Sequence, residues 1–493
     1  MIGKLCIAAG WVVGMYLTPT SIQAQADFEA WKQQQDAAFE SFLSEQDKAF
    51  LNFLNQRWDH FEGAREPDRE ALPKPDRMPR FEPEDEVPTD ILEIDKLPMP
   101  SVSIPAPPPP IPEQDRPPVP KSEIPPPIGI QVNFFGVDVF VPETKRFPRP
   151  LRGAVEKQHI ADYWAAISET PYKEALHQLQ AYRQRMQLND WGYARLVHET
   201  GEKIYPSSPN TRRLFVWFML TKSGYMAKVG YKNNDVVLLL PTHQVLYGNS
   251  YFTVSGHQGK FYAVEFEPSD RTTVASILTY KGDYPGAARR FDMRMTQMPI
   301  LGEDGLLKKL TFTHWGKNYT ASVHINRFIA AFFTDYPQTA FDVYFSAPLS
   351  DRTQKELIPA LKDLVQGMSE KEAANFILHF VQTAFAYQTD EAQFNREKPL
   401  FPEETLYYPA SDCEDRSVLF SYLVRHVLNL DVIGLDYPSH MATAVRFNEA
   451  VPGMRVRYDG KTYVICDPTF INADIGRPIP QVQQVTPKVI WGS

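Results

Sequence analysis

The sequence predicts an α+β protein made of several folded units. Apolar residues recur with helical spacing over residues 155–205 and 353–386, whereas apolar and polar residues alternate over much of 260–346 and 440–465. A chain of 493 residues is too long for one ordinary hydrophobic core, and its 43% hydrophobic content is enough to build more than one. We therefore expect several units along the chain, each built from helices and strands.

Residues 1–26 have the pattern of a secretory signal peptide. Lys4 gives a basic start, residues 5–17 are apolar, and residues 24–26 form a small-residue cleavage site before Asp27. The apolar run is too short to cross a bilayer, and no later segment reaches the ~20 apolar residues that a transmembrane helix needs. The sequence thus predicts a mature protein that is periplasmic or secreted and has no transmembrane span.

Residues 27–63 predict one amphipathic helix with an eleven-residue repeat. The repeat is carried by Phe28, Phe39, Phe50 and Phe61. Because eleven residues make almost three whole helical turns, these rings form one stripe along the helix. Such a stripe must be covered. It packs either on the protein itself or on a second copy, or alternatively on a membrane surface or an envelope partner.

Residues 64–127 predict a linker. They hold nearly half of the 43 prolines of the chain, mixed with acidic residues and few aromatics. A segment with so many rings that lack an N–H group cannot build a packed core. We expect an extended or disordered spacer, with docking of a proline-binding domain as the alternative.

Residues 128–350 predict two further units. The first, 128–259, starts with a strand-like run and continues through three helical patterns. The second, 260–350, is β-rich and fits a sandwich or a sheet packed between its neighbours. Its alternating runs cover residues 261–266, 272–280, 307–313, 319–325 and 339–346.

The most informative stretch lies in the last unit, residues 351–478, which a tail of residues 479–493 follows. Ser411 and Glu414 have the spacing of a capping box, so a helix should begin here with Cys413 in its first turn. The positive end of a helix dipole stabilises a thiolate. Cys413 is therefore a candidate nucleophile.

An imidazole and a carboxylate follow the thiol. His440 opens an alternating run, and Asp467 directly follows a strand-like run at 461–466. The Asp459-Gly460 pair before that run is a strong hairpin signal, so its strand should be antiparallel to its neighbour. If the strand of His440 joins the same sheet, His440 and Asp467 can meet at one edge.

The order Cys413, His440, Asp467 resembles the bacterial transglutaminase-like superfamily of papain-like fold. Its members have a D-C-x-D/E helix start, an isolated histidine that opens one strand and a D-P-T sequence that ends the next. The resemblance covers residues 355–478 and implies a Cys-His-Asp triad that attacks peptide or isopeptide amides through a thioester. Water as acceptor gives a cysteine protease or amidase, and a lysine amine gives a transglutaminase. A similar stretch that places Ser208 at the thiol position suggests a degenerate copy within 128–259.

Further residues have predicted roles in this site. Gln382 is an oxyanion candidate beside the backbone N–H of Cys413. Asp412, Tyr407 and Tyr408 are candidates for lining the cleft. The carboxylates next to the thiol would raise its pKa if they pointed inward, so we expect them to face solvent or to cap N–H groups.

The alternative function is a non-catalytic envelope scaffold that binds extended peptides. In either case the expected partner is a peptide or protein. No organic cofactor or metal is predicted, because there is no phosphate loop, dinucleotide glycine pattern or zinc-type spacing. A net charge of −9 without a basic cluster argues against nucleic acid as a partner.

Overall fold

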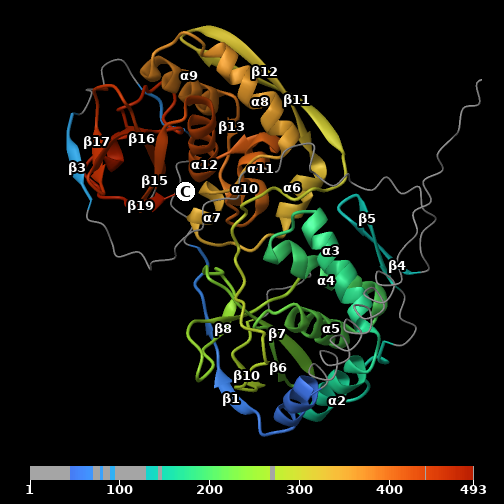
Figure 1. Cartoon of the computed structure of the whole chain (residues 1–493). Coiled ribbons are helices and arrows are strands. Elements are labelled where there is room, and N and C mark those ends of the chain that lie inside the picture. Colours follow the sequence, from blue (N-terminus) through green and yellow to red (C-terminus); the bar gives the residue numbers. More distant parts are fainter. Residues whose placement is uncertain are drawn as a thin grey trace, which may run out of the picture.

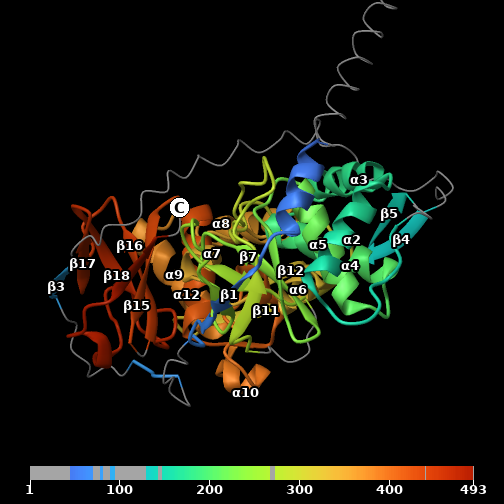
Figure 2. The same cartoon turned by 90° about the horizontal axis from the view of Figure 1, so that it is seen from below.

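Two α+β modules lie side by side in the computed structural model of the chain (Figures 1 and 2). The structure describes residues 45–69, 78–81, 89–94, 129–142, 147–266, 273–438 and 440–491. The predicted signal peptide and the first part of the predicted N-terminal helix lie outside these ranges. Each module combines helices with a mainly antiparallel sheet, which confirms the α+β class. Within the described ranges, no helix is both long and apolar enough to cross a bilayer.

The helices of the first module begin and end close to where helical spacing predicts them. They are α2 (Lys157–Ser168), α3 (Tyr172–Arg185), α4 (Asp190–Ile204) and α5 (Pro209–Lys222). A hairpin of β4 (Gly129–Phe134) and β5 (Val137–Pro142) precedes them. Trp164 of α2 and Trp217 of α5 are fully buried, with ring centroids 4.8 Å apart. The module therefore has an aromatic core of its own.

A seven-stranded sheet completes the first module. Its strands, in sheet order, are β1 (Asp59–Glu62), β10 (Ser276–Thr279), β6 (Lys228–Lys232), β7 (Asp235–Pro241), β9 (Phe261–Ala263), β8 (Ser250–Phe252) and β2 (Ala64–Arg65). Because β9 and β10 belong to this sheet, the module boundary predicted at residue 260 is wrong. Alternation along the sequence identifies strands but does not specify their partners.

The rest of the predicted β-rich unit is one long hairpin followed by helices. The elements are β11 (Gly305–His314), β12 (Lys317–Asn326), α6 (Arg327–Thr334) and α7 (Phe341–Phe345). The hairpin confirms the two strands predicted between residues 307 and 325. The strand predicted at 339–346 is wrong, because α7 occupies it. An apolar run this short fits a buried helix as well as a strand.

The second module places helices against a six-stranded sheet. The helices are α8 (Asp351–Leu364), α9 (Glu370–Thr383), α10 (Asp390–Phe394), α11 (Pro402–Tyr407) and α12 (Cys413–Leu423), and β13 (Ala386–Tyr387) pairs with β14 (Ala410–Ser411) between them. The sheet order is β19 (Lys488–Trp491), β15 (Asp431–Tyr437), β16 (His440–Arg446), β18 (Lys461–Cys466), β17 (Arg455–Tyr458) and β3 (Ile91–Glu93). The predicted hairpin turn is present, with φ of 49° at Asp459 and 72° at Gly460. The predicted tail of residues 479–493 is not only a tail, because it contributes β19.

The two sheets share one strand order. In the first, β6 to β10 follow the order β10-β6-β7-β9-β8, and in the second β15 to β19 follow β19-β15-β16-β18-β17. The preceding helices also agree: Arg212 of α5 and Arg416 of α12 are both the fourth residue and both buried. The first residue is Pro209 in α5 and Cys413 in α12. When the two helices are aligned at their first residues, Pro209, and not Ser208, corresponds to Cys413.

The N-terminal segment packs on the first module. A helix covers residues 45–54, and its Phe50 ring lies 4.7 Å from that of Trp164. The continuous helix predicted for 27–63 is wrong after residue 54, because Phe61 lies in β1, which pairs with β10. The described part of the aromatic stripe is thus covered by the protein itself.

Two pieces of the predicted spacer pack on the second module, and we call residues 78–81 and β3 together the linker strap. Ile471 donates its N–H to Pro79 at 3.0 Å, and Phe81 donates its N–H to Ile471 at 2.8 Å. β3 pairs in parallel with β17 at the outer edge of the sheet (Figure 1). The described parts of the predicted spacer are therefore paired rather than free.

Candidate active site

Cys413 is the first residue of α12, as the sequence predicts, but the helix cap is shifted by one residue. The N-cap is Asp412, whose N–H donates to Oδ2 of Asp415 at 3.2 Å. The capping pair predicted at Ser411 and Glu414 is therefore wrong, and Ser411 instead accepts from Nε of Arg416 at 3.1 Å. Asp412 is fully buried in this role, so it does not line an open cleft.

His440 and Asp467 meet at the edge of the second sheet. Nε2 of His440 lies 2.8 Å from Oδ2 of Asp467. The Asp467 carboxylate also accepts backbone N–H groups from Thr469 at 3.0 Å, Phe470 at 3.2 Å and Ile479 at 3.3 Å. His440 is the first residue of β16 and Asp467 follows the last residue of β18, and these two strands are paired. The pairing of the strands therefore sets the pairing of the side chains.

The start of α12 lies against the start of β16. One turn after Cys413, the hydroxyl of Ser417 donates to the carbonyl of Met441 at 3.1 Å, and Met441 is the neighbour of His440. The thiol itself donates to Oε2 of Glu414 at 3.1 Å. Cys413 is 1% exposed and His440 is 2% exposed. The three predicted catalytic residues thus lie in one buried region, with the thiol directed at a carboxylate.

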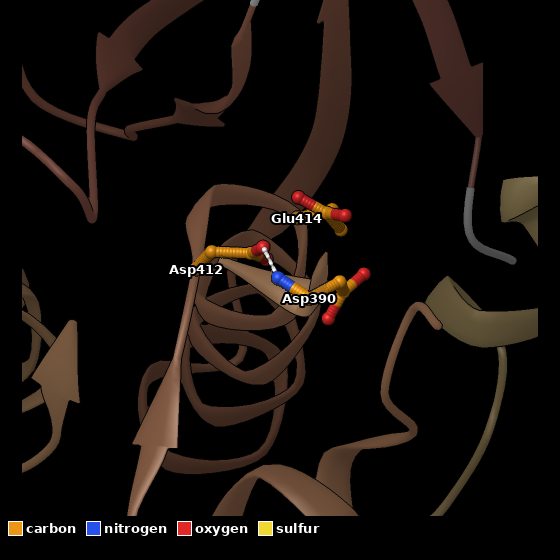
Figure 3. A group of neighbouring side chains, drawn as sticks. All are labelled: Asp390, Asp412 and Glu414. Atoms are coloured by element: carbon orange, nitrogen blue, oxygen red, sulfur yellow. Dashed lines mark hydrogen bonds between the residues drawn. The ribbon is translucent and has the colours of Figure 1, made fainter. Parts of the chain in front are cut away.

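Buried carboxylates gather beside the thiol. Figure 3 shows Asp390, Asp412 and Glu414, which each bring one carboxylate oxygen within 4.8 Å of the other two. Asp390 donates its N–H to Oδ2 of Asp412 at 3.2 Å and accepts from the N–H of Lys398 at 2.8 Å. The sequence predicts that the acids next to the thiol, Asp412, Glu414 and Asp415, point to solvent or cap N–H groups. Asp412 and Asp415 do accept backbone N–H groups, but Glu414 accepts from the thiol. Asp390 is not predicted, because only the tertiary fold brings α10 to this point.

Asp390, Asp412 and Glu414 form a candidate cation site. Carboxylate oxygens are the ligands that Ca²⁺ and Mg²⁺ use. No comparable group of three His, Cys, Asp or Glu side chains occurs elsewhere among the described residues. The sequence predicts no metal, because it contains no zinc-type spacing. Asp390 and Asp412 are 22 residues apart, and only the fold brings them together.

Arg416 places a positive charge near Asp412 and Asp415. Its guanidinium is fully buried and donates to the carbonyls of Gln382, Phe385 and Ala386 at 2.9 to 3.1 Å. Burial lowers the pKa of Arg416 to about 10, although Asp412 and Asp415 act in the opposite direction. The side chain therefore ties α12 to the end of α9 and offsets part of the local negative charge.

Gln382 does not have the geometry of an oxyanion donor. Its amide donates to the carbonyls of Asp467 at 3.1 Å and Ala473 at 3.0 Å, and its oxygen accepts from the N–H of Asn472 at 3.2 Å. Both amide protons are thus used within the fold. Gln382 fixes the loop that carries Asp467, which sequence spacing could not distinguish from a catalytic role.

Tyr407 and Tyr408 lie at the end of α11, where they contact each other. Their ring centroids are 5.1 Å apart, and the ring of Tyr408 lies 5.0 Å from that of Phe394 on α10. Burial raises the pKa of Tyr408 to about 12. These contacts place both rings in a local aromatic cluster, and none of the ring contacts found among the described residues joins them to the triad.

Comparison of the chain with protein-family models, with curated proteins and with solved structures finds no match.

Proposed function

We propose that the second module is a cysteine-dependent acyl-transfer enzyme with Cys413 as nucleophile. The observation that carries this proposal is the bond between His440 and Asp467. It holds the imidazole through Nε2, so Nδ1 is the nitrogen that would serve the thiol. An oriented imidazole beside a cysteine at a helix start is the arrangement that activates a thiol.

In the proposed reaction, His440 takes the thiol proton as the sulfur attacks an amide carbonyl. The same proton then goes to the leaving amine, which leaves a thioester on Cys413. Water or a second amine next attacks the thioester carbon and releases the thiolate. Asp467 keeps the imidazole in the correct tautomer and stabilises its charged form. The backbone N–H of Cys413, at the start of α12, is the proposed oxyanion donor.

The substrates that fit this chemistry are peptide or isopeptide amides, and hydrolysis is the outcome we propose. The signal-peptide pattern of residues 1–26 supports a reaction in the cell envelope or outside the cell. The described structure is a closed form, because the thiol and the imidazole are buried. Substrate entry thus requires movement of the segments around the start of α12.

We further propose that the first module is a degenerate copy of the second. The shared strand order and the buried Arg212 and Arg416 support this proposal. Lys232 of β6 pairs with Asp235 of β7 next to the turn between these strands. Tyr437 of β15 pairs with His440 of β16 in the same way. Asp235 and Pro209 thus stand where the imidazole and the thiol are in the second module, so the copy carries no catalytic cysteine.

The rival function is a non-catalytic scaffold that binds extended peptides. The bond from the thiol to Glu414 favours it, because a thiol held by a carboxylate is a poor nucleophile. The rate of alkylation by iodoacetamide near neutral pH distinguishes the two. A catalytic thiol should react fast and lose that rate in His440→Ala, whereas a packing thiol should react slowly in both proteins. Digestion of a peptide library by wild type but not by Cys413→Ala would then identify the substrate.

A further inference from the structure

A cavity of about 820 Å³ lies in the first module, away from the proposed catalytic triad. Its walls come from the end of α3, the start of α4 and the chain between residues 289 and 300. Four arginines and two aspartates line it: Arg183, Arg185, Arg289, Arg294, Asp190 and Asp292. Cavities of this size hold small organic ligands.

The cavity carries an excess of positive charge in a chain whose net charge is −9. Its two carboxylates are already paired, Asp190 with Arg183 at 2.6 Å and Asp292 with Arg294 at 2.5 Å. Among the described residues, no carboxylate lies within ion-pair distance of Arg185 or Arg289. Two guanidinium groups thus remain for a ligand.

A buried hydrogen-bond network around Asp190 holds Arg183 in position. Asp190 is 8% exposed, and its Oδ1 accepts from the hydroxyl of Tyr225 at 2.6 Å as well as from Arg183. Its Oδ2 accepts the backbone N–H of Asp292 at 2.9 Å. Because a buried carboxylate holds Arg183 in place, this guanidinium does not need to be ordered when a ligand binds.

The guanidinium of Arg289 is fixed in a different way. It lies 3.9 Å from the centroid of the Tyr225 ring and donates to the carbonyl of Ser223 at 3.2 Å. The guanidinium of Arg185 lies 4.7 Å from the ring centroid of Tyr182. Stacking on aromatic rings leaves the in-plane N–H groups of arginine free to meet an anion. These contacts therefore fix the positions of both guanidinium groups before a ligand binds.

We propose that this cavity is a binding site for a small organic anion that carries a carboxylate or phosphate group. Planar guanidinium groups recognise both groups through paired hydrogen bonds. Side-chain amides of Gln180, Gln184, Gln187 and Gln297 line the rest of the cavity and suit hydroxyl or amide groups of the same ligand. The site is separate from the triad, so this inference does not depend on the proposed acyl transfer.

Isothermal titration of the whole mature chain with pyrophosphate and with citrate tests the site. We expect wild type to bind at least one of them, with an affinity that weakens as salt rises. Binding of pyrophosphate alone would identify a phosphate ligand, and binding of citrate alone would identify a carboxylate ligand. Failure of wild type to bind either anion at low salt would overturn the proposal.

Substitutions in the cavity test the residues. Arg289→Gln and Arg185→Gln should each weaken binding about tenfold or more, because each removes a charge-assisted hydrogen-bond pair. Arg327→Gln is the matched control, since Arg327 is an exposed arginine of α6 outside the cavity, and its affinity should equal that of wild type. Equal affinity of all three variants would overturn the proposal.

A charge-conserving variant separates recognition by the guanidinium from simple attraction. Arg289→Lys keeps the charge but loses the paired N–H groups, so it should bind about as weakly as Arg289→Gln. Full affinity in Arg289→Lys would overturn guanidinium recognition. Arg289 is exposed, so its variants should keep the melting temperature of wild type. An unchanged melting temperature would show that a loss of affinity does not result from unfolding.

Discussion

The thiol of Cys413 donates a hydrogen bond to Oε2 of Glu414, its neighbour in the chain, at 3.1 Å. Both side chains are buried, and the carboxylates of Asp390 and Asp412 lie close to Glu414. Negative charge of this density opposes the loss of a proton from sulfur. The thiol is therefore held as a donor to Glu414, and the acyl transfer that we propose requires its release from this carboxylate.

The first prediction concerns this carboxylate. Glu414→Gln removes one charge next to the sulfur, so alkylation of Cys413 by iodoacetamide should become about tenfold faster at neutral pH. The midpoint of the rate against pH should move to lower pH for the same reason. Glu391→Gln, an exposed acid on α10, should leave the rate unchanged. Equal rates in wild type and Glu414→Gln would show that Glu414 does not restrain the thiol.

The second prediction separates the structural and catalytic roles of Gln382. Gln382→Leu leaves two carbonyls and one N–H without their partner, so we expect a loss of roughly 2–4 kcal/mol in the free energy of unfolding. Thermal or chemical denaturation measures it. The exposed Gln366→Leu is the control and should change little. A large fall in kcat with unchanged stability would instead restore the oxyanion role.

The third prediction concerns acid stability of the first module. Burial lowers the pKa of His198 to about 3, with the charges of Arg212 and Arg195 acting in the same direction. Below pH 6.5 the unfolded chain binds a proton that the folded protein excludes, so stability falls as pH falls from 6.5 toward 3. Between pH 6.5 and pH 5 this single group should cost about 2 kcal/mol.

Chemical denaturation at several pH values checks this prediction. The variant His198→Gln cannot titrate in this range, so it should lose about 2 kcal/mol less stability than wild type between pH 6.5 and pH 5. His243→Gln, at an exposed histidine, should behave as wild type does. Parallel stability curves for wild type and His198→Gln would contradict the prediction.

The fourth prediction concerns the linker strap. Phe81 packs edge-on against Phe470, with ring centroids 6.0 Å apart, and the guanidinium of Arg477 lies 4.2 Å from its ring centroid. Phe81→Ala should therefore loosen residues 78–81 by about 1–2 kcal/mol. The amide of Ile471 donates to Pro79, so its hydrogen exchange should become about ten times faster or more.

The control for Phe81→Ala is a substitution in β3, the other part of the linker strap. Glu93→Gln weakens the exposed ion pair of β3 with Arg457, which lies 2.6 Å away, but leaves the contacts of Phe81 intact. Exchange of the Ile471 amide should then match wild type. Unchanged exchange in Phe81→Ala would show that the aromatic contact does not hold the strap.

Local patterns predicted the elements of this fold better than their partners. The helical spacing of residues 155–205 and the Asp459-Gly460 turn depend only on neighbouring residues, and both are present in the structure. The pairing of β10 with β1 and β6 joins segments that are far apart in the chain, and no local pattern records it. The same holds for β3 on β17.

The candidate site shows the same division. Cys413, His440 and Asp467 were identified from local cues, a helix start and two strand ends. The bond of the thiol to Glu414 and the nearness of Asp390 depend on side-chain direction and on the packing of α10. For Gln382 the sequence predicts an oxyanion donor, but its amide donates to the carbonyls of Asp467 and Ala473. A sequence does not show which partners a buried amide has.

The strap imposes an order on assembly. Synthesis of the chain supplies β3 long before residues 455–458 leave the ribosome, so that strand must wait for its partner until nearly the whole polypeptide exists. Its closure is thus among the last events of folding, since a loop of more than 350 residues has to form first. A nascent or truncated protein would present the edge of β17 bare, open to strands of other molecules.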